Sequence, residues 1–380
     1  MSTIKVNSIK NASTDDGGIA IDNTGHVQID GQQLPTAGAL SNRNLIINGA
    51  MQVSQRGDST GVTSTDYYGP DRYRFINNTG TYSISQSTTA PEGFSNSWKL
   101  DCTTAGSLST GGIVLLQQRI EAQNVQHLKY GTSSAVNLTA SFWIRSNKTG
   151  VVTVEFYQPD DVREIAKTIT INAANTWEYK TVTIPGDTTG VIDSNNDRGL
   201  ELLFWFGAGT DFTSGTHNTS AWATANNTSN RVSSSNIDIS DSTANELYLT
   251  GVQLEVGEKA TPFEHRSFGD ELQRCERYFQ TYGPIFGLVF SNYTASVGYG
   301  GLPLRTEMRT NPTVYHLEAF NSSHLNYYSA NAARTLTSFT LNLGRTHMLQ
   351  FAVGGTLGTQ GYAAHLDINQ NDAIQIQAEL

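Results

Sequence analysis

The sequence has few cysteines, no long apolar run and no basic leader, and each absence excludes a class of protein. Its two cysteines, Cys102 and Cys275, are far apart and stand in different apolar patterns, so we expect two buried thiols and no disulfide. No segment approaches the roughly 18 consecutive apolar residues of a transmembrane helix, so we expect no membrane insertion. No stretch near the N-terminus combines basic residues with an apolar run, and we expect no secretory signal there.

Positive charge is also sparse. The chain has 24 Lys and Arg residues against 34 Asp and Glu residues, a formal net charge of −10, and no long basic run. Because nucleic-acid binding depends on clustered cations that neutralise phosphates, we expect no nucleic-acid partner. The eight histidines are scattered, with none paired at metal-ligand spacing. We expect no metal and no cofactor.

One acidic stretch partly matches a calcium-binding loop. Asp193, Asn195 and Asp197 stand at alternate positions ahead of Gly199. The glycine falls one residue late for such a loop, and Phe204 stands where the glutamate of the twelfth position is needed. A polar turn is the preferred interpretation, and calcium is the alternative.

The catalytic patterns also lack the context that they need. Ser59 is the centre of GDSTG, which matches the G-x-S-x-G nucleophile elbow, but loop-like residues flank it where a strand and a helix are required. Asp160 and Asp161 are adjacent, and in an extended segment they point in opposite directions. We predict no catalytic residue and no enzymatic activity.

What the sequence does contain is two-residue alternation of apolar side chains, separated by turn residues, over residues 42–265. Residues 136–145 are one example, and residues 98–102 are another. LELLFWF, residues 200–206, is apolar on both faces and predicts a central strand. Many such strands predict an all-β domain that is an antiparallel jelly-roll β-sandwich.

Residues 1–41 form a separate N-terminal segment with three very short alternating runs. Strands this short cannot bury a core alone. We therefore expect the segment to pair with copies of itself or with another protein. The apolar residues of the runs are Ile4, Val6 and Ile9, then Ile19 and Ile21, then Val27 and Ile29.

The end of the sandwich contains a change of parity. Leu247 and Leu249 alternate in one phase, and Val252 and Leu254 continue in the other. Because a strand with one buried face must keep one phase, this change predicts a β-bulge at Gly251.

A helix is predicted over residues 266–282. Ser267 and Asp270 make a suitable N-terminal capping pair. The spacing of the apolar residues is that of a coiled-coil seam, and the alternative is a helix that lies on its own sandwich. The seam residues are Phe268, Leu272, Cys275, Phe279 and Tyr282.

Residues 283–380 return to alternation and predict a small C-terminal β-sandwich. Its expected strands are residues 288–290, 297–304, 314–317, 339–343, 348–353 and a last strand at 374–376.

Aromatic residues in polar loops are the candidates for glycan binding. A sugar ring stacks its apolar face on Trp or Tyr, while its hydroxyls bond to nearby polar groups. The alternative for each is an aromatic ring that covers local apolar surface. Trp98 and Trp205 stand in strand patterns and are expected in the core. The expected exposed candidates are Trp222, Tyr67, Tyr68, His324, Tyr327 and Tyr328.

Several stretches resemble bacteriophage tail fibre and receptor-binding proteins whose central domain is a carbohydrate-binding-module-like jelly roll. The two that carry most of the resemblance are RNLIINGAMQVSQRG at 43–57 and TGVQLEVGEKATPFEHRSFGDELQRCERYFQ at 250–280. YGPDRYRF, LPLRTEMRTNPTV and the final IQIQAEL are also similar. STIKVNSIKN and DNTGHVQIDG are similar to short virion-attachment segments in phages of marine hosts.

The resemblance implies a homotrimeric fibre in the virion, made in the cytoplasm of the host. Residues 1–41 would attach to the tail, the baseplate or an adaptor protein, residues 266–282 would form a three-helix junction, and residues 283–380 would be the tip. Its expected partner is a glycan on the surface of a bacterial host. The alternatives are a tail-associated polysaccharide depolymerase and a purely structural tail or head-fibre component.

Overall fold

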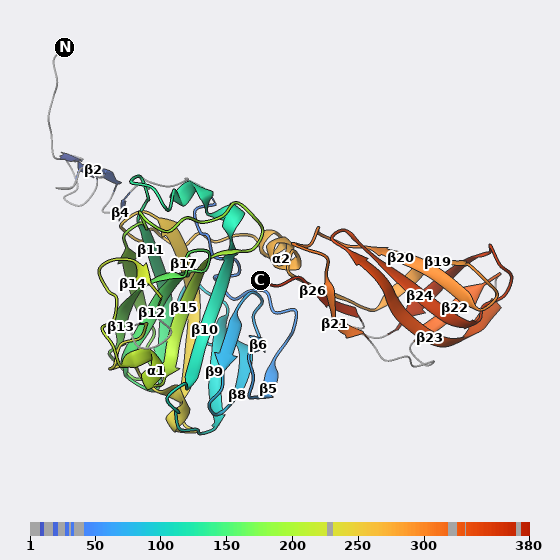
Figure 1. Ribbon diagram of the computed structural model, residues 1–380, viewed down its shortest axis with the longest axis horizontal. Coiled ribbons are helices and arrows are strands. Elements are labelled where there is room, and N and C mark those ends of the chain that lie inside the picture. The colour runs from blue at the N-terminus through green and yellow to red at the C-terminus, as the bar shows by residue number, and fades with distance from the viewer. Residues whose placement is uncertain are drawn as a thin grey trace, which may run out of the picture. The chain divides into compact units, whose positions relative to one another are not determined.

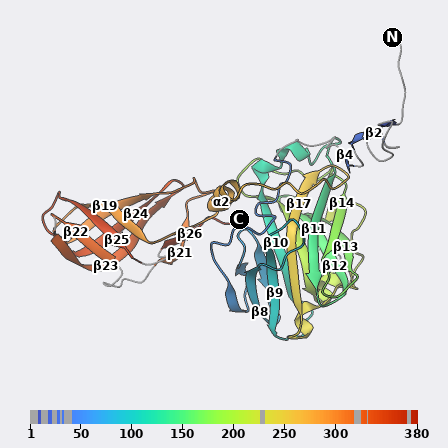
Figure 2. The same ribbon diagram turned by 180° about the vertical axis from the view of Figure 1, so that it is seen from behind.

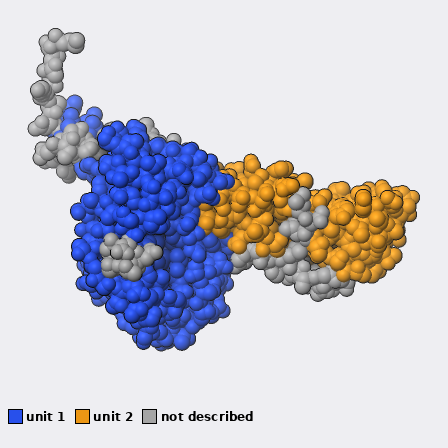
Figure 3. Space-filling view, viewed as in Figure 1, with its two compact units in different colours: residues 1–266 blue, residues 267–380 orange. Residues whose placement is uncertain are grey.

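The computed structural model describes residues 8–10, 18–21, 27–29, 32–33, 42–225, 231–317, 325–330, 332–369 and 374–380. The chain divides into two compact units, residues 1–266 and residues 267–380, which are coloured separately in Figure 3. The boundary lies next to the expected end of the jelly roll at residue 265. Residues 267–282 belong to the second unit.

The first unit contains a β-sandwich of two antiparallel sheets, which confirms the predicted jelly-roll class (Figure 1). One sheet has seven strands in the order β16 (Ala223–Thr224), β13 (Arg163–Ile171), β12 (Gly150–Gln158), β15 (Arg198–Ala208), β10 (Ile113–Glu121), β7 (Arg74–Asn77) and β6 (Asp66–Tyr67). The other has six, in the order β14 (Glu178–Ile184), β11 (Leu138–Ser146), β17 (Glu246–Val256), β9 (Ser97–Thr104), β8 (Thr81–Ser87) and β5 (Ser59–Val62). Figure 2 shows β11 between β14 and β17 from behind.

Alternation in the sequence decides which side chains fill the space between the sheets. Phe142 and Ile144 of β11 and Phe204 of β15 are fully buried in this core, because side chains two residues apart point to one face of a strand. Short helices connect the strands: η1 (Ala122–Asn124), η2 (Gln126–Leu128), α1 (Thr210–Thr213) and η3 (Ile239–Asp241).

Strand β15 is central, as its two apolar faces predicted. It pairs with β10 on one side and with β12 on the other. Its second face carries Leu203 and Trp205 into a smaller apolar cluster that includes Val232 and Phe212. The segment after α1 therefore covers part of the outer face of the seven-stranded sheet.

The predicted bulge is present in β17. Ser141 of β11 lies opposite Gln253, and Trp143 lies opposite Thr250, so Gly251 and Val252 together face one residue of the partner strand. Gly251 has φ +62°, a conformation that favours glycine. The extra residue keeps both halves of β17 directed into the same core.

The described part of residues 1–41 forms a four-stranded antiparallel sheet of very short strands. Its strands are β1 (Ser8–Lys10), β2 (Gly18–Ile21), β3 (Val27–Ile29) and β4 (Gln32–Gln33). Ile9, Ile19 and Ile21 are 61%, 41% and 44% exposed. This sheet leaves apolar side chains uncovered within the single chain. Ile4 and Val6 lie outside the described residues.

The second unit is not the β-sandwich that the sequence predicted. Six of its strands close into an antiparallel barrel in the order β19 (Ile285–Asn292), β20 (Val297–Pro303), β24 (Met348–Thr356), β23 (Ala332–Arg345), β22 (Leu325–Ser329) and β25 (Ala363–Ile368). A separate sheet contains β18 (Phe279–Tyr282), β26 (Ile374–Gln377) and β21 (Thr313–Leu317). Strands β22 and β25 were not predicted, and their pairing, together with that of β25 with β19, closes the barrel.

The predicted 266–282 helix is also corrected. Helix α2 spans Phe268–Glu276, with the Ser267 hydroxyl accepting a hydrogen bond from the Asp270 amide at 3.2 Å, as the capping pair predicted. Phe279 and Tyr282 belong instead to β18, which pairs with β26.

The five residues of the predicted coiled-coil seam therefore do not share one helical stripe. Phe268 is 57% exposed and Leu272 is half-buried, whereas Cys275, Phe279 and Tyr282 are buried within the chain. A nine-residue helix is too short for a stable coiled coil. Among the described residues, none of the helices has the length and apolar character needed to span a bilayer.

Candidate functional site

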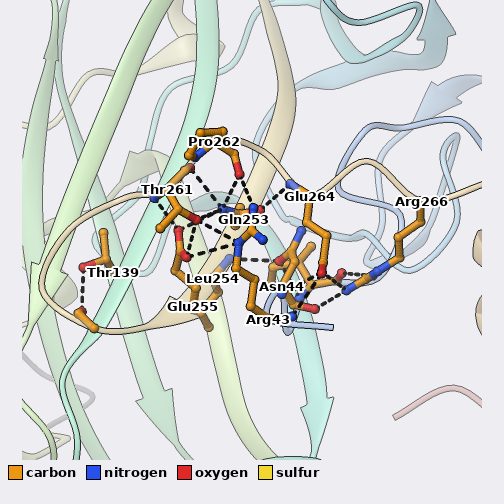
Figure 4. Close-up of polar contacts among 12 residues, drawn as sticks. Arg43, Asn44, Thr139, Gln253, Leu254, Glu255, Thr261, Pro262, Glu264 and Arg266 are labelled. Carbon is orange, nitrogen blue, oxygen red and sulfur yellow. Dashed lines mark hydrogen bonds and ion pairs between the residues drawn. The ribbon is translucent and has the colours of Figure 1, made fainter. Parts of the chain in front are cut away.

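Residues from the two stretches that carry most of the resemblance, 43–57 and 250–280, form a network of polar contacts that we call the polar clasp (Figure 4). Asn44 is almost fully buried, and its side-chain oxygen accepts hydrogen bonds from the amides of Leu254 and Ile46, both at 3.0 Å. Its amide nitrogen donates to the Val252 carbonyl at 3.2 Å. One asparagine thus fixes the first residues of the sandwich onto its last long strand.

Two carboxylates complete the clasp. Glu255, 2% exposed, accepts from the Thr261 amide at 2.8 Å and from the Thr261 hydroxyl at 2.6 Å. Arg43 Nε donates to the same threonine hydroxyl at 2.8 Å and lies 3.6 Å from Glu255. Glu264 accepts from the Arg43 and Asn44 amides at 3.2 and 3.0 Å. The motif therefore joins the beginning of the sandwich to its end, a structural role.

Three of the predicted glycan-binding residues are buried and not exposed: Trp222 and Tyr67 in the first unit, and Tyr327 in the second. Trp222 is 8% exposed; its Nε1 donates to the Pro185 carbonyl at 2.8 Å and its ring packs edge-to-face on Tyr130 at 5.6 Å. Tyr67 is 5% exposed, with the Arg56 guanidinium 5.3 Å from its ring centroid. Both rings cover local apolar surface, which was the alternative for each.

The other candidates lie in different environments. Tyr68 is half-buried and packs against the main core, with its hydroxyl 3.1 Å from that of Ser64. Tyr327 points into the barrel, where its hydroxyl donates to Asn292 at 2.7 Å and burial raises its pKa to about 12. Tyr328 is partly exposed and stacks on His365 at 5.0 Å. His324 lies outside the described residues.

The residues that the sequence analysis rejected as catalytic, Ser59, Asp160 and Asp161, have structural roles. Ser59 begins β5, so it does not stand on a turn between a strand and a helix. Asp160 and Asp161 accept hydrogen bonds from the amides of Asp193 and Val191, at 3.0 and 2.7 Å. These two carboxylates hold a neighbouring loop against the β12–β13 turn.

A group of polar residues lies on the outer face of the seven-stranded sheet, where the apolar cover ends. We call it the arginine face. Side chains directly opposite on adjacent antiparallel strands are neighbours, and the pairing places Arg74 beside Gln117, Arg119 beside Glu201, and Glu201 beside Tyr157. The arginine face comprises Arg74, Gln117, Arg119, Tyr157, Arg198 and Glu201.

One carboxylate organises the arginine face. Glu201, 2% exposed, accepts from Gln117 Nε2 at 2.5 Å and from Arg198 Nη1 at 2.9 Å, and it lies 3.4 Å from Arg119 Nε. Burial raises the pKa of Glu201, while Arg119 and Arg198 oppose that shift. The network holds two guanidinium groups in fixed positions on the sheet.

A second set of carboxylates lies beyond Tyr157 and is covered. Glu155 is fully buried and bonds Arg231 Nε and Trp205 Nε1, at 2.6 and 2.7 Å. Glu164 is also fully buried, and its Oε2 has no hydrogen-bond partner among the described residues. Burial, with a smaller contribution from the Glu155 charge, raises the pKa of Glu164 to about 8. Burial therefore favours the protonated form of Glu164.

Four aromatic residues lie on the opposite side of the sandwich, on the outer face of the six-stranded sheet. We call Trp143, Trp177, Tyr179 and Tyr248 the aromatic face. Trp143 and Tyr179 are directly opposite on β11 and β14, with ring centroids 5.3 Å apart, and Tyr179 is 45% exposed. Trp177 lies 6.2 Å from Tyr248. Strand β14 is the edge of its sheet, so this face is accessible from the side.

Cations flank the aromatic face. The Arg145 guanidinium lies 4.8 Å from the centroid of the Tyr248 ring, and Lys99 Nζ lies 5.5 Å from it. Arg145 Nε also donates to the Asn175 carbonyl at 3.1 Å. The result is two pairs of rings with polar groups beside them, in which Tyr248 is only 6% exposed and Tyr179 is the most accessible ring. Rings and polar groups together are the combination that a sugar can use.

Neither face was predicted from the sequence, because the glycan-binding candidates chosen there were aromatic residues in polar loops. The sequence signal for the aromatic face was present, because Trp143 occupies the solvent-facing phase of the strand at 136–145. An aromatic residue in that phase has no core to fill. The arginine face had no comparable signal, since its members come from four strands, β7, β10, β12 and β15, that are far apart in the sequence.

Comparisons with known proteins gave no close relative. No protein family and no curated protein matches the chain. Among solved structures, the enzymatically active domain of bacteriophage CBA120 tailspike protein 4 aligns over 56% of this chain and 21% of its own, with 12% identity and a TM-score of 0.29. This chain therefore spans about a fifth of that tailspike chain.

Two carbohydrate-binding modules are similar at the same low level. A family 11 module from Clostridium thermocellum, in complex with a β-1,3-1,4-mixed-linked tetrasaccharide, covers 54% of this chain and 98% of its own, with 14% identity and a TM-score of 0.25. A CBM4 structure covers 55% and 98%, with 12% identity and a TM-score of 0.28. With scores this low, the assignment of the fold depends on the strand pairing described above.

Proposed function

We propose that this chain is a bacteriophage tail fibre or receptor-binding protein that adsorbs to a bacterial host by binding surface glycan. The sequence resemblance in residues 43–57 and 250–280 supports the phage assignment. The aromatic face supports glycan binding, because it places the partly exposed Trp143 and Tyr179 rings side by side on a rigid strand pair. Several such weak sites on one fibre bind by avidity.

The observation that carries the proposal is the exposure of Tyr179, which is 45% although the residue lies in a strand. Replacing Tyr179 with alanine should weaken binding of the chain to host polysaccharide by about 5- to 30-fold, because a stacked ring contributes roughly 1–2 kcal/mol. Isothermal titration with purified capsule or lipopolysaccharide measures the change.

The matched control is Tyr362, a tyrosine in the second unit that is 50% exposed. Tyr362→Ala should leave the affinity for the polysaccharide unchanged. Equal affinities for wild type and Tyr179→Ala would show that the aromatic face does not bind the glycan.

We propose further that the chain has no catalytic activity. Glycoside hydrolysis needs two carboxyl groups that the substrate can reach, and Glu164 and Glu155, whose charges interact, both have fully buried side chains. Incubation with host polysaccharide should therefore release no reducing ends. Release that disappears in Glu164→Gln would instead support the depolymerase alternative.

The proposed location is the virion, with the chain as a homotrimer that attaches to a tail, baseplate or adaptor protein through residues 1–41. The exposed Ile9, Ile19 and Ile21 support a partner for this segment, because a sheet of such short strands has no core of its own. Light scattering should give three chains for the full protein and a smaller mass after deletion of residues 1–41. A monomeric full-length protein at micromolar concentration would contradict this proposal.

A further inference from the structure

We propose that the arginine face is a second binding site, separate from the aromatic face, and that it takes an anionic group on a glycan with Arg74 as the principal contact. The inference rests on the proposed function for the class of ligand, a polysaccharide. The proposed ligand of the arginine face is an acidic sugar. This face lies on the seven-stranded sheet, whereas Tyr179 lies on the six-stranded sheet.

The first observation is the position of Arg74. It stands on β7 with its side chain on the outer face, because its neighbour Phe75 points into the main core. Among the described residues, Arg74 makes one hydrogen bond, from Nη1 to Gln117 Oε1 at 3.5 Å, and no ion pair. A half-buried guanidinium with one long hydrogen bond retains donors for a ligand.

The second observation is an excess of positive charge. Three guanidinium groups, those of Arg74, Arg119 and Arg198, face the carboxylate of Glu201, and Asp66 lies at the edge of the same group. Burial lowers the pKa of Arg74, and the charge of Arg119 lowers it further. Guanidinium groups this close repel each other, and an anion between them would relieve that repulsion.

The sign of the charge here is opposite to that of the whole chain, which is −10. The neighbouring carboxylate does not cancel it, because Glu155 is paired with Arg231 at 2.6 Å. A local patch of this kind concentrates anions at one place on an otherwise anionic surface.

The surroundings favour a sugar acid over a free small anion. Tyr157, opposite Glu201 on β12, is half-buried, and the Arg231 guanidinium lies 5.0 Å from the centroid of its ring. Guanidinium groups recognise planar carboxylates with paired donors, and a ring next to them can contact the apolar side of a pyranose. A carboxylate and a sulfate are both suitable anions, and the experiment separates them.

The test uses the full chain and two matched pairs of polymers in isothermal titration. Polygalacturonate is compared with its carboxyl-reduced form, and dextran sulfate is compared with dextran. Binding of an acidic polymer should weaken by about tenfold or more in Arg74→Gln, which loses charge-assisted hydrogen bonds. Added salt should weaken it as well. Arg198→Gln removes a cation that is already paired with Glu201 at 2.9 Å and should give a smaller decrease.

Two controls make the result specific. Lys129→Gln changes the net charge equally at an exposed position outside the arginine face and should bind as wild type does. Tyr179→Ala should retain the affinity for the acidic polymer. Tryptophan fluorescence during urea unfolding shows whether each variant keeps its fold.

The proposal is supported if an acidic polymer binds the wild type and Tyr179→Ala but not Arg74→Gln. The polymer that binds identifies the anion, a carboxylate for polygalacturonate and a sulfate for dextran sulfate. Equal binding of the acidic and neutral partner of each pair overturns it and leaves the proposed function intact. Loss of acidic-polymer binding in Tyr179→Ala, with none in Arg74→Gln, also overturns it. If host polysaccharide binds the wild type but neither acidic polymer binds it, the inference about the arginine face is wrong. The proposed function is then unaffected.

Discussion

Replacing Glu255 with alanine should lower the free energy of unfolding of the sandwich by about 3–5 kcal/mol, the usual cost of removing one partner of a buried, hydrogen-bonded charge. The change leaves the Thr261 amide and hydroxyl without their acceptor, and it removes the carboxylate 3.6 Å from Arg43 Nε. All five tryptophans lie in the first unit, so tryptophan fluorescence during urea unfolding reports on this unit.

The matched control for this prediction is Glu258, an exposed glutamate in the same segment whose side chain accepts one hydrogen bond, from Asn137 at 2.8 Å. Glu258→Ala should cost less than about 1 kcal/mol. Similar stabilities for the two variants would mean that the clasp contributes little to holding the ends of the sandwich together.

The second large effect is expected at the bulge. Replacing Gly251 with alanine should destabilise the sandwich by about 3 kcal/mol, the sum of a left-handed backbone conformation and an overpacked site. The added Cβ would lie 2.7 Å from Phe94 Cζ and 3.0 Å from Trp143 Cδ1. Phe94 cannot move freely, because its ring packs on Phe263 at 5.0 Å and on His265 at 5.3 Å.

A substitution at Gly61 separates the cost of the left-handed backbone conformation from the cost of overpacking. Its φ of +67° is close to the +62° of Gly251, but a Cβ there would meet nothing within 4 Å. Gly61→Ala should therefore show only the backbone cost, about 1–2 kcal/mol. If both alanine variants lost the same stability, crowding by Phe94 and Trp143 would have no part in the effect. Tryptophan fluorescence during urea unfolding again gives the measurement.

Local pattern was a good guide to the sandwich. Alternation placed the strands at 98–102 and 136–145 correctly, and the apolar run at 200–206 is the central strand β15. The parity change also located the bulge at Gly251. These features depend on residues within one strand, where a period of two records which side chains face the core.

The same reasoning failed where long-range pairing decides the structure. The heptad spacing of Phe279 and Tyr282 predicted a helix, but pairing with β26 makes them part of a strand. Trp222 was expected in solvent, but a carbonyl and a ring from distant segments bury it. Local patterns contain no information about which distant segment covers a residue.

The candidate binding faces show which features follow from the sequence and which follow from the tertiary structure. The sequence by itself determined that the chain is mainly β, that Trp143 points away from the core and that β17 must bulge at Gly251, because these follow from the alternation of neighbours along one strand. Only the tertiary structure decided that the second unit closes as a barrel, and that Arg74, Arg119 and Arg198 gather around Glu201. The physical reason is that alternation specifies the face of a strand, whereas the order and register of strands depend on contacts between segments far apart in the chain.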